Sequence, residues 1–153
     1  MSGPNEPLDA GLAAAQEALV RAITAGGPLP PGFDPAAVDA AARSILYKRA
    51  SEVARTWPAL AASYGPDWKN TFADWAARRP TNGSVRDAWD FAREHTGGLS
   101  AEAVRELALT DARFRYDGRG EPRRRRAAVR RVPGGVIVQI MGRARTLGPA
   151  ARR

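Results

Sequence analysis

The side chains of this chain that could bind a charged ligand are arginines, and they are concentrated near its C-terminal end. Four follow one another in the run Arg123–Arg126, and Arg130 and Arg131 come shortly after. Guanidinium groups form paired hydrogen bonds with phosphates and with carboxylates, so the run suits either anion. Three interpretations stay open: binding of nucleic-acid phosphates, binding of an acidic peptide or protein, and a solvated basic face that blunts a sheet edge.

A second group of chemically capable side chains lies between residues 87 and 95. Asp87, Asp90 and Glu94 share one face of a predicted helix, whereas His95 points about 100° away from Glu94. The chain has one His and no Cys, which leaves few ligands for a transition metal. We interpret the group as a solvated acidic face. Since no phosphate loop or nucleophile elbow is present either, we expect a non-enzymatic chain with no cofactor of its own.

Charge is distributed unevenly along the 153 residues. The formal net charge is +8, from 24 Lys and Arg against 16 Asp and Glu. Residues 1–112 carry 11 basic and 14 acidic side chains, whereas residues 113–153 carry 13 arginines and only two acids. The excess positive charge therefore lies in the last quarter of the chain, attached to a body that is mildly acidic.

Composition also bounds the class of protein. With 44% hydrophobic residues the chain is expected to fold as one domain with tails. It has no run of 18 apolar residues, its first residues do not resemble a signal peptide, and the absence of Cys fits a reducing compartment. We expect a cytoplasmic protein with no membrane segment.

Hydrophobic spacing predicts an α+β fold, in which about five helices form an N-terminal bundle and a small antiparallel sheet follows. The helical domain spans residues 1–111, with helices near 8–24, 35–57, 67–79, 84–96 and 100–111. Asp34, Ser84 and Ser100 are placed as N-caps of the second, fourth and fifth helices. The aromatic residues sit at helical spacing, so we expect them in the core rather than as a platform for stacking bases.

After residue 111 the pattern alternates, which predicts a sheet subdomain over residues 112–142 and a flexible basic tail over 143–153. Pro133-Gly134-Gly135 separates two strands of a hairpin. Val136, Val138 and Ile140 share one face of the second strand, which could line a groove for an extended peptide. The alternative is that this strand is simply the central, buried one, with the Arg-rich strand as the exposed edge.

The middle of the chain resembles a known family. The residues that carry the resemblance are Tyr47-Lys48-Arg49, Val53, Trp57-Pro58-Ala59-Leu60, Tyr64-Gly65, Phe72, Trp75, Pro80, Asp87 and Phe91-Ala92. This pattern, over residues 44–93, resembles the helical domain, named for DNA binding, of HvfC- and BufC-type proteins. Trp57 stands where the family usually has Phe, and the basic C-terminal part lies outside the match.

The resemblance implies a role as a partner of multinuclear non-haem iron-dependent oxidases (MNIO enzymes). Such partners form a heterodimer with the oxidase, which holds the iron, and they bind the precursor peptide of a ribosomally made natural product. Their helical domain docks on the enzyme and a small C-terminal sheet takes the leader peptide.

On this basis we predict a site for an acidic leader peptide on the sheet. The predicted peptide-binding residues are Arg115, Arg124, Arg126, Arg130, Val136, Val138 and Ile140. Backbone pairing is expected from residues 136–141 or from the neighbouring strand. The alternative is a DNA- or RNA-binding regulatory protein that uses the same arginines on phosphates.

Overall fold

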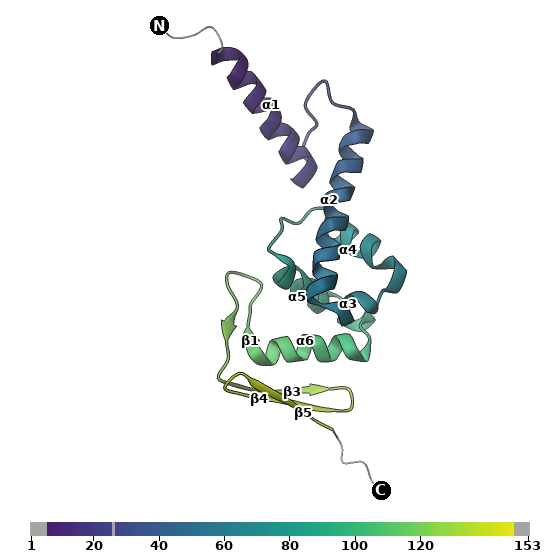
Figure 1. Ribbon diagram of the computed structural model, residues 1–153, viewed down its shortest axis with the longest axis vertical. Helices are drawn as coiled ribbons and strands as arrows, with labels where there is room; N and C mark the ends of the chain where they lie inside the picture. The colour runs from purple at the N-terminus through teal and green to yellow at the C-terminus, as the bar shows by residue number, and fades with distance from the viewer. Residues whose placement is uncertain (1–5, 26, 149–153) are drawn as a thin grey trace. The chain divides into compact units, whose positions relative to one another are not determined.

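The computed structural model describes residues 6–25 and 27–148, and within them six α-helices precede two small antiparallel sheets (Figure 1). The α-helices are α1 (Glu6–Ala25), α2 (Pro35–Thr56), α3 (Pro58–Ala62), α4 (Trp68–Ala76), α5 (Ser84–Glu94) and α6 (Ala101–Arg113). Two short 3₁₀ turns are η1 (Gly65–Asp67) and η2 (Thr96–Gly98). The strands are β1 (Phe114–Arg115), β2 (Arg123–Arg124), β3 (Ala127–Val132), β4 (Gly135–Ile140) and β5 (Arg143–Leu147). The predicted α+β class is confirmed.

Two of the three predicted N-caps, Asp34 and Ser100, are confirmed by their hydrogen bonds, whereas the third was wrong: Ser84 is the first residue of α5 and Gly83 is its N-cap. Asp34 accepts from the backbone N–H of Ala36 at 3.0 Å, and Ser100 accepts from that of Ala103 at 3.2 Å. The short helix α3 was not predicted, because no helix was expected between residues 57 and 67. Proline suits the first turn of a helix, and Pro58 begins α3.

The chain divides into two compact units. The first comprises the described part of Met1–Ser51 together with Lys69–Thr81. Phe72 is fully buried in it, and the Arg49 guanidinium lies 5.9 Å from the Phe72 ring centroid. Arg49 also donates to the backbone carbonyl of Arg79 at 2.8 Å, so it ties the end of α4 to α2. Trp75 is half-buried in this unit.

The second unit comprises Glu52–Trp68 and the described part of Asn82–Arg153. Aromatic rings form its helical core: the centroids of Trp57 and Trp89 lie 6.4 Å apart, and those of Trp68 and Phe91 lie 5.3 Å apart. All four side chains are at most 5% exposed, which confirms their predicted place in the core. This unit departs from the predicted boundary at residue 111, because α6 packs on the sheet that follows it.

The sheet of β3, β4 and β5 packs on α6 through a small apolar core. Ala108 and Ala112 of α6 and Ile137 of β4 are its buried members, and Leu109, Ala128, Val132 and Ala144 pack around them. Figure 1 shows the three strands running along α6. Arg105 of α6 also donates to the carbonyl of Pro133 at the β3–β4 turn, at 3.0 Å. The small side chains of the helix allow the sheet to approach closely.

Strand β5 corrects the prediction of a flexible tail over residues 143–153. Residues 143–147 pair with β4, from Ile140 opposite Arg143 to Val136 opposite Leu147. The connection is the two-residue turn Met141-Gly142, whose φ angles of 50° and 85° match the type I′ turn that joins tight hairpins. Residues 149–153 of the predicted tail lie outside the described residues. Within the described ranges, no helix is long and apolar enough to cross a membrane.

Alternation along β4 predicts unequal effects for two isoleucines of the same strand. Ile137→Ala removes a side chain that is 2% exposed, so it should lower the free energy of unfolding by about 2–4 kcal/mol. Ile140→Ala removes one that is 59% exposed, so the loss should stay below about 1 kcal/mol. Urea unfolding followed by circular dichroism measures both. Equal losses would contradict the described orientation of β4.

Candidate functional site

One face of the three-stranded sheet is turned away from α6 and forms the candidate site. On β4, Ile137 and Gln139 are buried against the helix. Successive side chains of a strand point to opposite faces, so every other β4 residue faces outward. These outward residues are Val136, Val138 and Ile140, the three aliphatic residues predicted to line a peptide groove. We call the surface that they occupy the outer face.

Strand register adds residues of the two edge strands to the outer face. The resulting rows across β3, β4 and β5 are Ala127–Ile140–Arg143, Val129–Val138–Arg145 and Arg131–Val136–Leu147. The central strand is therefore aliphatic, and arginines stand on both edge strands. Val129, Ile140 and Leu147 are each more than half exposed. Exposed apolar side chains gathered on one face are typical of an interaction surface.

A hollow of about 710 Å³ lies over the β4–β5 half of the outer face. Its lining consists of Val138, Ile140, Met141, Arg143, Arg145 and Leu147. That volume falls within the range of sites that hold small ligands or a few peptide side chains. We call it the apolar hollow.

Two of the predicted arginines, Arg124 and Arg126, lie in a second hollow of about 470 Å³. Its other lining residues are Arg113, Phe114, Arg125, Met141 and Gly142, and we call it the arginine hollow. Arg125 is held in place, since its Nε donates to the Phe114 carbonyl at 3.1 Å. The Arg124 guanidinium lies 5.8 Å from the centroid of the Phe114 ring.

The other two predicted arginines are placed elsewhere. Arg130 points to the inner side of the sheet, where its Nη2 donates to the Asp111 carbonyl in the last turn of α6, at 3.3 Å. That position suits a cation because the C-terminal end of a helix is partly negative. Arg115 is exposed on β1 and lines a separate hollow of about 360 Å³ with Asp117 and Arg119. The structure therefore does not bring all four predicted arginines together.

Backbone pairing restricts where an extended peptide could add to the sheet. β4 is hydrogen-bonded on both sides, so the predicted pairing through its own residues is not available. The neighbouring strands β3 and β5 are the two edges of this sheet. Of these, β3 makes the greater part of the contact with α6, and β5 makes the smaller part.

Sequence reasoning missed the residues of β5 that complete the apolar hollow: Arg143, Arg145 and Leu147. They were assigned to a tail because arginines alternating with small residues have no apolar stripe. The available signal was Gly142, which permits a tight turn directly after the apolar strand and so allows residues 143–147 to fold back on it.

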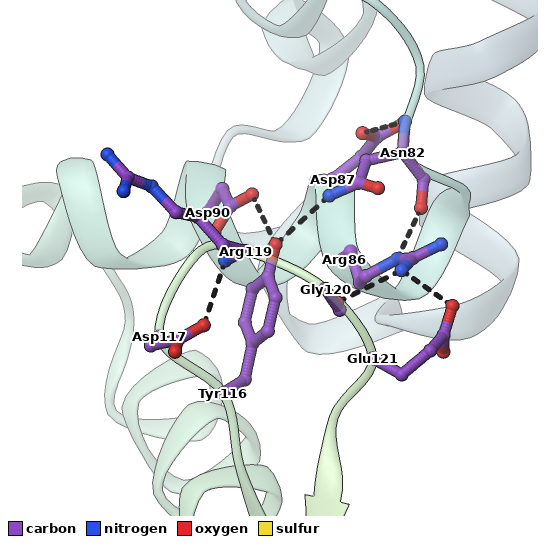
Figure 2. A network of polar contacts seen from close by, with 9 residues as sticks. All are labelled: Asn82, Arg86, Asp87, Asp90, Tyr116, Asp117, Arg119, Gly120 and Glu121. Atoms are coloured by element: carbon purple, nitrogen blue, oxygen red, sulfur yellow. Dashed lines mark hydrogen bonds and ion pairs between the residues drawn. The ribbon is translucent and has the colours of Figure 1, made fainter.

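A network of polar contacts fastens α5 to the loop between β1 and β2 (Figure 2). The Tyr116 hydroxyl donates to Asp90 Oδ2 at 3.0 Å and accepts from Asn82 Nδ2 at 3.1 Å. Arg86 Nη1 donates to the Gly120 carbonyl at 3.0 Å and to Glu121 Oε1 at 2.8 Å. These bonds hold the loop that leads into the arginine run.

Burial changes the acidity of the groups at the centre of this network. It raises the pKa of Tyr116 to about 12, and the adjoining Asp90 carboxylate, which accepts its hydrogen bond, acts in the same direction. Burial also raises the pKa of Asp90, against the opposing effects of the Tyr116 hydrogen bond and the Arg93 charge. A protonated Tyr116 is therefore part of the folded arrangement.

Asp87 and Asp90 of the acidic cluster on α5 are structural, so the interpretation as a solvated face was wrong for these two, whereas Glu94 is exposed. Asp87 is only 2% exposed and accepts from the backbone N–H of Asn82 at 3.0 Å, while Asp90 is bonded to Tyr116. The His95 ring stacks on Phe91 with centroids 4.2 Å apart. Within residues 6–25 and 27–148, no three His, Cys, Asp or Glu side chains are grouped so that they could hold a metal ion.

Comparison with known proteins gives two matches. The family model described as "SCO6045-like, C-terminal domain" matches residues 13–97, more than half of the chain. A "UPF0276 protein" of Streptomyces avermitilis is 37% identical over 130 residues, which cover 83% of this chain. The chain spans about a quarter (26%) of the length of that relative. No solved structure matches the chain.

The network around Tyr116 predicts how stability depends on alkaline pH. At neutral pH, Tyr116→Phe should lower the free energy of unfolding by about 1–3 kcal/mol, because Asp90 and Asn82 lose their common partner. The hydroxyl stays protonated in the folded chain up to about pH 12, whereas in the unfolded chain it ionises near 10. The difference in the free energy of unfolding between the wild type and Tyr116→Phe should therefore narrow as pH rises from about 10 to 12.

Urea unfolding of both proteins at a series of pH values measures this difference. A difference in the free energy of unfolding that stays constant from neutral pH to pH 12 would contradict the described environment of Tyr116. Absorbance titration of the three tyrosines should also show a group that ionises near pH 12 in the wild type and is missing from the variant, while Tyr64, whose pKa is also raised by burial, titrates in both proteins.

Proposed function

We propose that this chain, which belongs to the SCO6045-like C-terminal domain family, is a non-catalytic partner protein of an iron-dependent oxidase of the MNIO type. In this role it binds a ribosomal precursor peptide and presents that peptide to the oxidase. The observation that carries the proposal is the outer face of the sheet. It is aliphatic along its central strand, largely exposed, and continues into an open edge at β5.

Such a surface suits an extended peptide. Main-chain hydrogen bonds to an edge strand give affinity, and pockets for alternate side chains give specificity. The edge β5 is adjacent to the apolar hollow, so a strand added there would place alternate side chains beside Arg143, Arg145 and Leu147 of β5. The arginines Arg143 and Arg145 of the same strand would favour carboxylates on the peptide.

The comparisons support a role beside a larger protein. In the Streptomyces avermitilis relative, the matched region is about a quarter of the chain, and the family is described as a C-terminal domain. A module that occurs attached to a longer polypeptide is placed to act together with it. The resemblance over residues 44–93 supplies the class of that partner, an oxidase that holds iron.

Nucleic-acid binding is the second candidate function, and the arginine hollow is the observation in its favour. Four arginines line it, and among the described residues no carboxylate lies within ion-pair distance of them. Phosphate contacts would make binding strongly salt-dependent. The exposed aliphatic outer face does not suit a phosphate backbone, so we favour the peptide.

Co-expression with a candidate MNIO-type oxidase and its precursor peptide tests the proposal. The purified complex should contain both proteins, iron and the peptide, as measured by mass spectrometry and metal analysis. Ile140→Glu places a charge on the outer face, so it should lower the affinity for the peptide about tenfold or more.

Ile45→Glu is the matched control for peptide binding, because Ile45 is 48% exposed on α2 and lies outside the sheet. The control should keep the peptide. The proposal fails if the protein purifies without oxidase or peptide and instead retards random duplex DNA with a steep dependence on salt.

A further inference from the structure

We propose that the peptide site is bipartite: the arginine hollow binds two or more carboxylates of the peptide, and the apolar hollow binds aliphatic side chains that adjoin them. This inference rests on the proposed function and names the class of peptide. Its ligand is a segment in which acidic residues stand next to a short aliphatic, alternating stretch.

The two hollows share a residue, which makes them parts of one surface. Met141 lines both the arginine hollow and the apolar hollow. It is the most exposed large hydrophobic residue described, at 79%, and its φ of 50° is unusual for a residue other than glycine. A strained, exposed methionine in a tight turn contributes little to folding, but its flexible thioether can contact an apolar ligand.

Acidic partners within the chain are already engaged elsewhere, which leaves the arginine hollow to an outside anion. Asp111 is paired with Arg93 at 2.6 Å, and Glu121 with Arg86 at 2.8 Å. Asp117 accepts from the backbone N–H of Arg119 at 2.9 Å. These are the acids nearest in sequence to the arginine run.

The hollow is built to keep its shape without a ligand. The backbone N–H of Arg125 donates to the Arg113 carbonyl at 2.9 Å, and its side chain is fixed on Phe114. The side-chain amide of Gln139 is buried beside the Met141-Gly142 turn. Both of its polar atoms are hydrogen-bonded: the oxygen accepts from the Gly142 N–H at 2.7 Å, and the nitrogen donates to the Ala112 carbonyl at 3.3 Å. Arg125 is therefore preorganised, and a preorganised guanidinium group binds a carboxylate with a smaller loss of conformational entropy, whereas Arg124 and Arg126 are exposed.

Charge and shape together favour a peptide over a free anion or a nucleic acid. A phosphate would occupy the arginine hollow but would leave the apolar hollow beside it empty. A segment with carboxylates at one end and aliphatic side chains along the rest fills both, with Met141 between them. The side-chain alternation of an extended peptide also matches the spacing of the rows on the outer face.

Selection from a phage-displayed library of random dodecapeptides on the immobilised full chain tests the inference. Enriched peptides should carry at least two Asp or Glu next to alternating aliphatic residues. For a synthetic, fluorescein-labelled copy of an enriched peptide, replacing its acids by amides should weaken binding about tenfold or more in fluorescence anisotropy.

Matched double variants assign the effect to the arginine hollow. Arg124→Gln with Arg126→Gln should remove the preference for the acidic over the amide peptide. Arg119→Gln with Arg123→Gln removes the same charge from exposed residues outside both hollows and should keep the preference. Met141→Asn retains the turn, because Asn tolerates positive φ, and should weaken both peptides alike.

Four results would overturn the inference. Enriched peptides without acidic residues would overturn it. A preference for the acidic over the amide peptide that survives Arg124→Gln with Arg126→Gln would overturn it as well. Both results would leave the proposed function standing. Displacement of the peptide by inorganic phosphate or by duplex DNA that binds more tightly would make the arginine hollow a phosphate site. If no peptide is enriched, the bipartite site is rejected, and the co-purification described above decides separately whether the proposed function fails.

Discussion

The packing of α6 against the inner face of the three-stranded sheet is the contact on which the rest of the second unit depends. Ala108 and Ala112 present almost no side chain, so the sheet can lie close to the helix and Ile137 fills the space between them. Burying one face of the sheet fixes which side of every strand is exposed, because a shift of one residue would reverse all of them. The outer face is therefore a consequence of how α6 is composed.

The arginines of the second unit divide into those that are bonded within it and those that are exposed. Arg93, Arg86 and Arg130 are used inside the unit, where they bond to Asp111, to Glu121 and to the end of α6. Arg131, Arg143 and Arg145 stand on the outer face, and Arg124 and Arg126 line the arginine hollow. Exposed ion pairs contribute little to stability, so unpaired arginines at a surface are better explained by an outside partner than by folding. The positive charge of the C-terminal quarter is thus divided among the outer face, the arginine hollow and a separate hollow at Arg115 and Arg119.

Much of this fold could be predicted from the sequence, because its determinants are local. The caps Asp34 and Ser100, the Pro133-Gly134 turn and the apolar alternation of β4 depend on neighbouring residues only. The candidate site was harder to predict from the sequence. Arg130 and Arg124 are alike in sequence, and only the packing of α6 turns the first one inward. Strand β5 was missed because its stability comes from pairing with β4, to which Arg143 and Arg145 contribute no apolar pattern.

Hydrogen–deuterium exchange of the full chain, with and without the precursor peptide of a candidate partner system, tests most directly whether the sheet is the docking surface. The account predicts slower exchange for the amides of β5, residues 143–147, and of the Met141-Gly142 turn when peptide is present, with the helices of the first unit unchanged. Protection confined to the helices, or protection of the arginine run by duplex DNA but not by peptide, would contradict it.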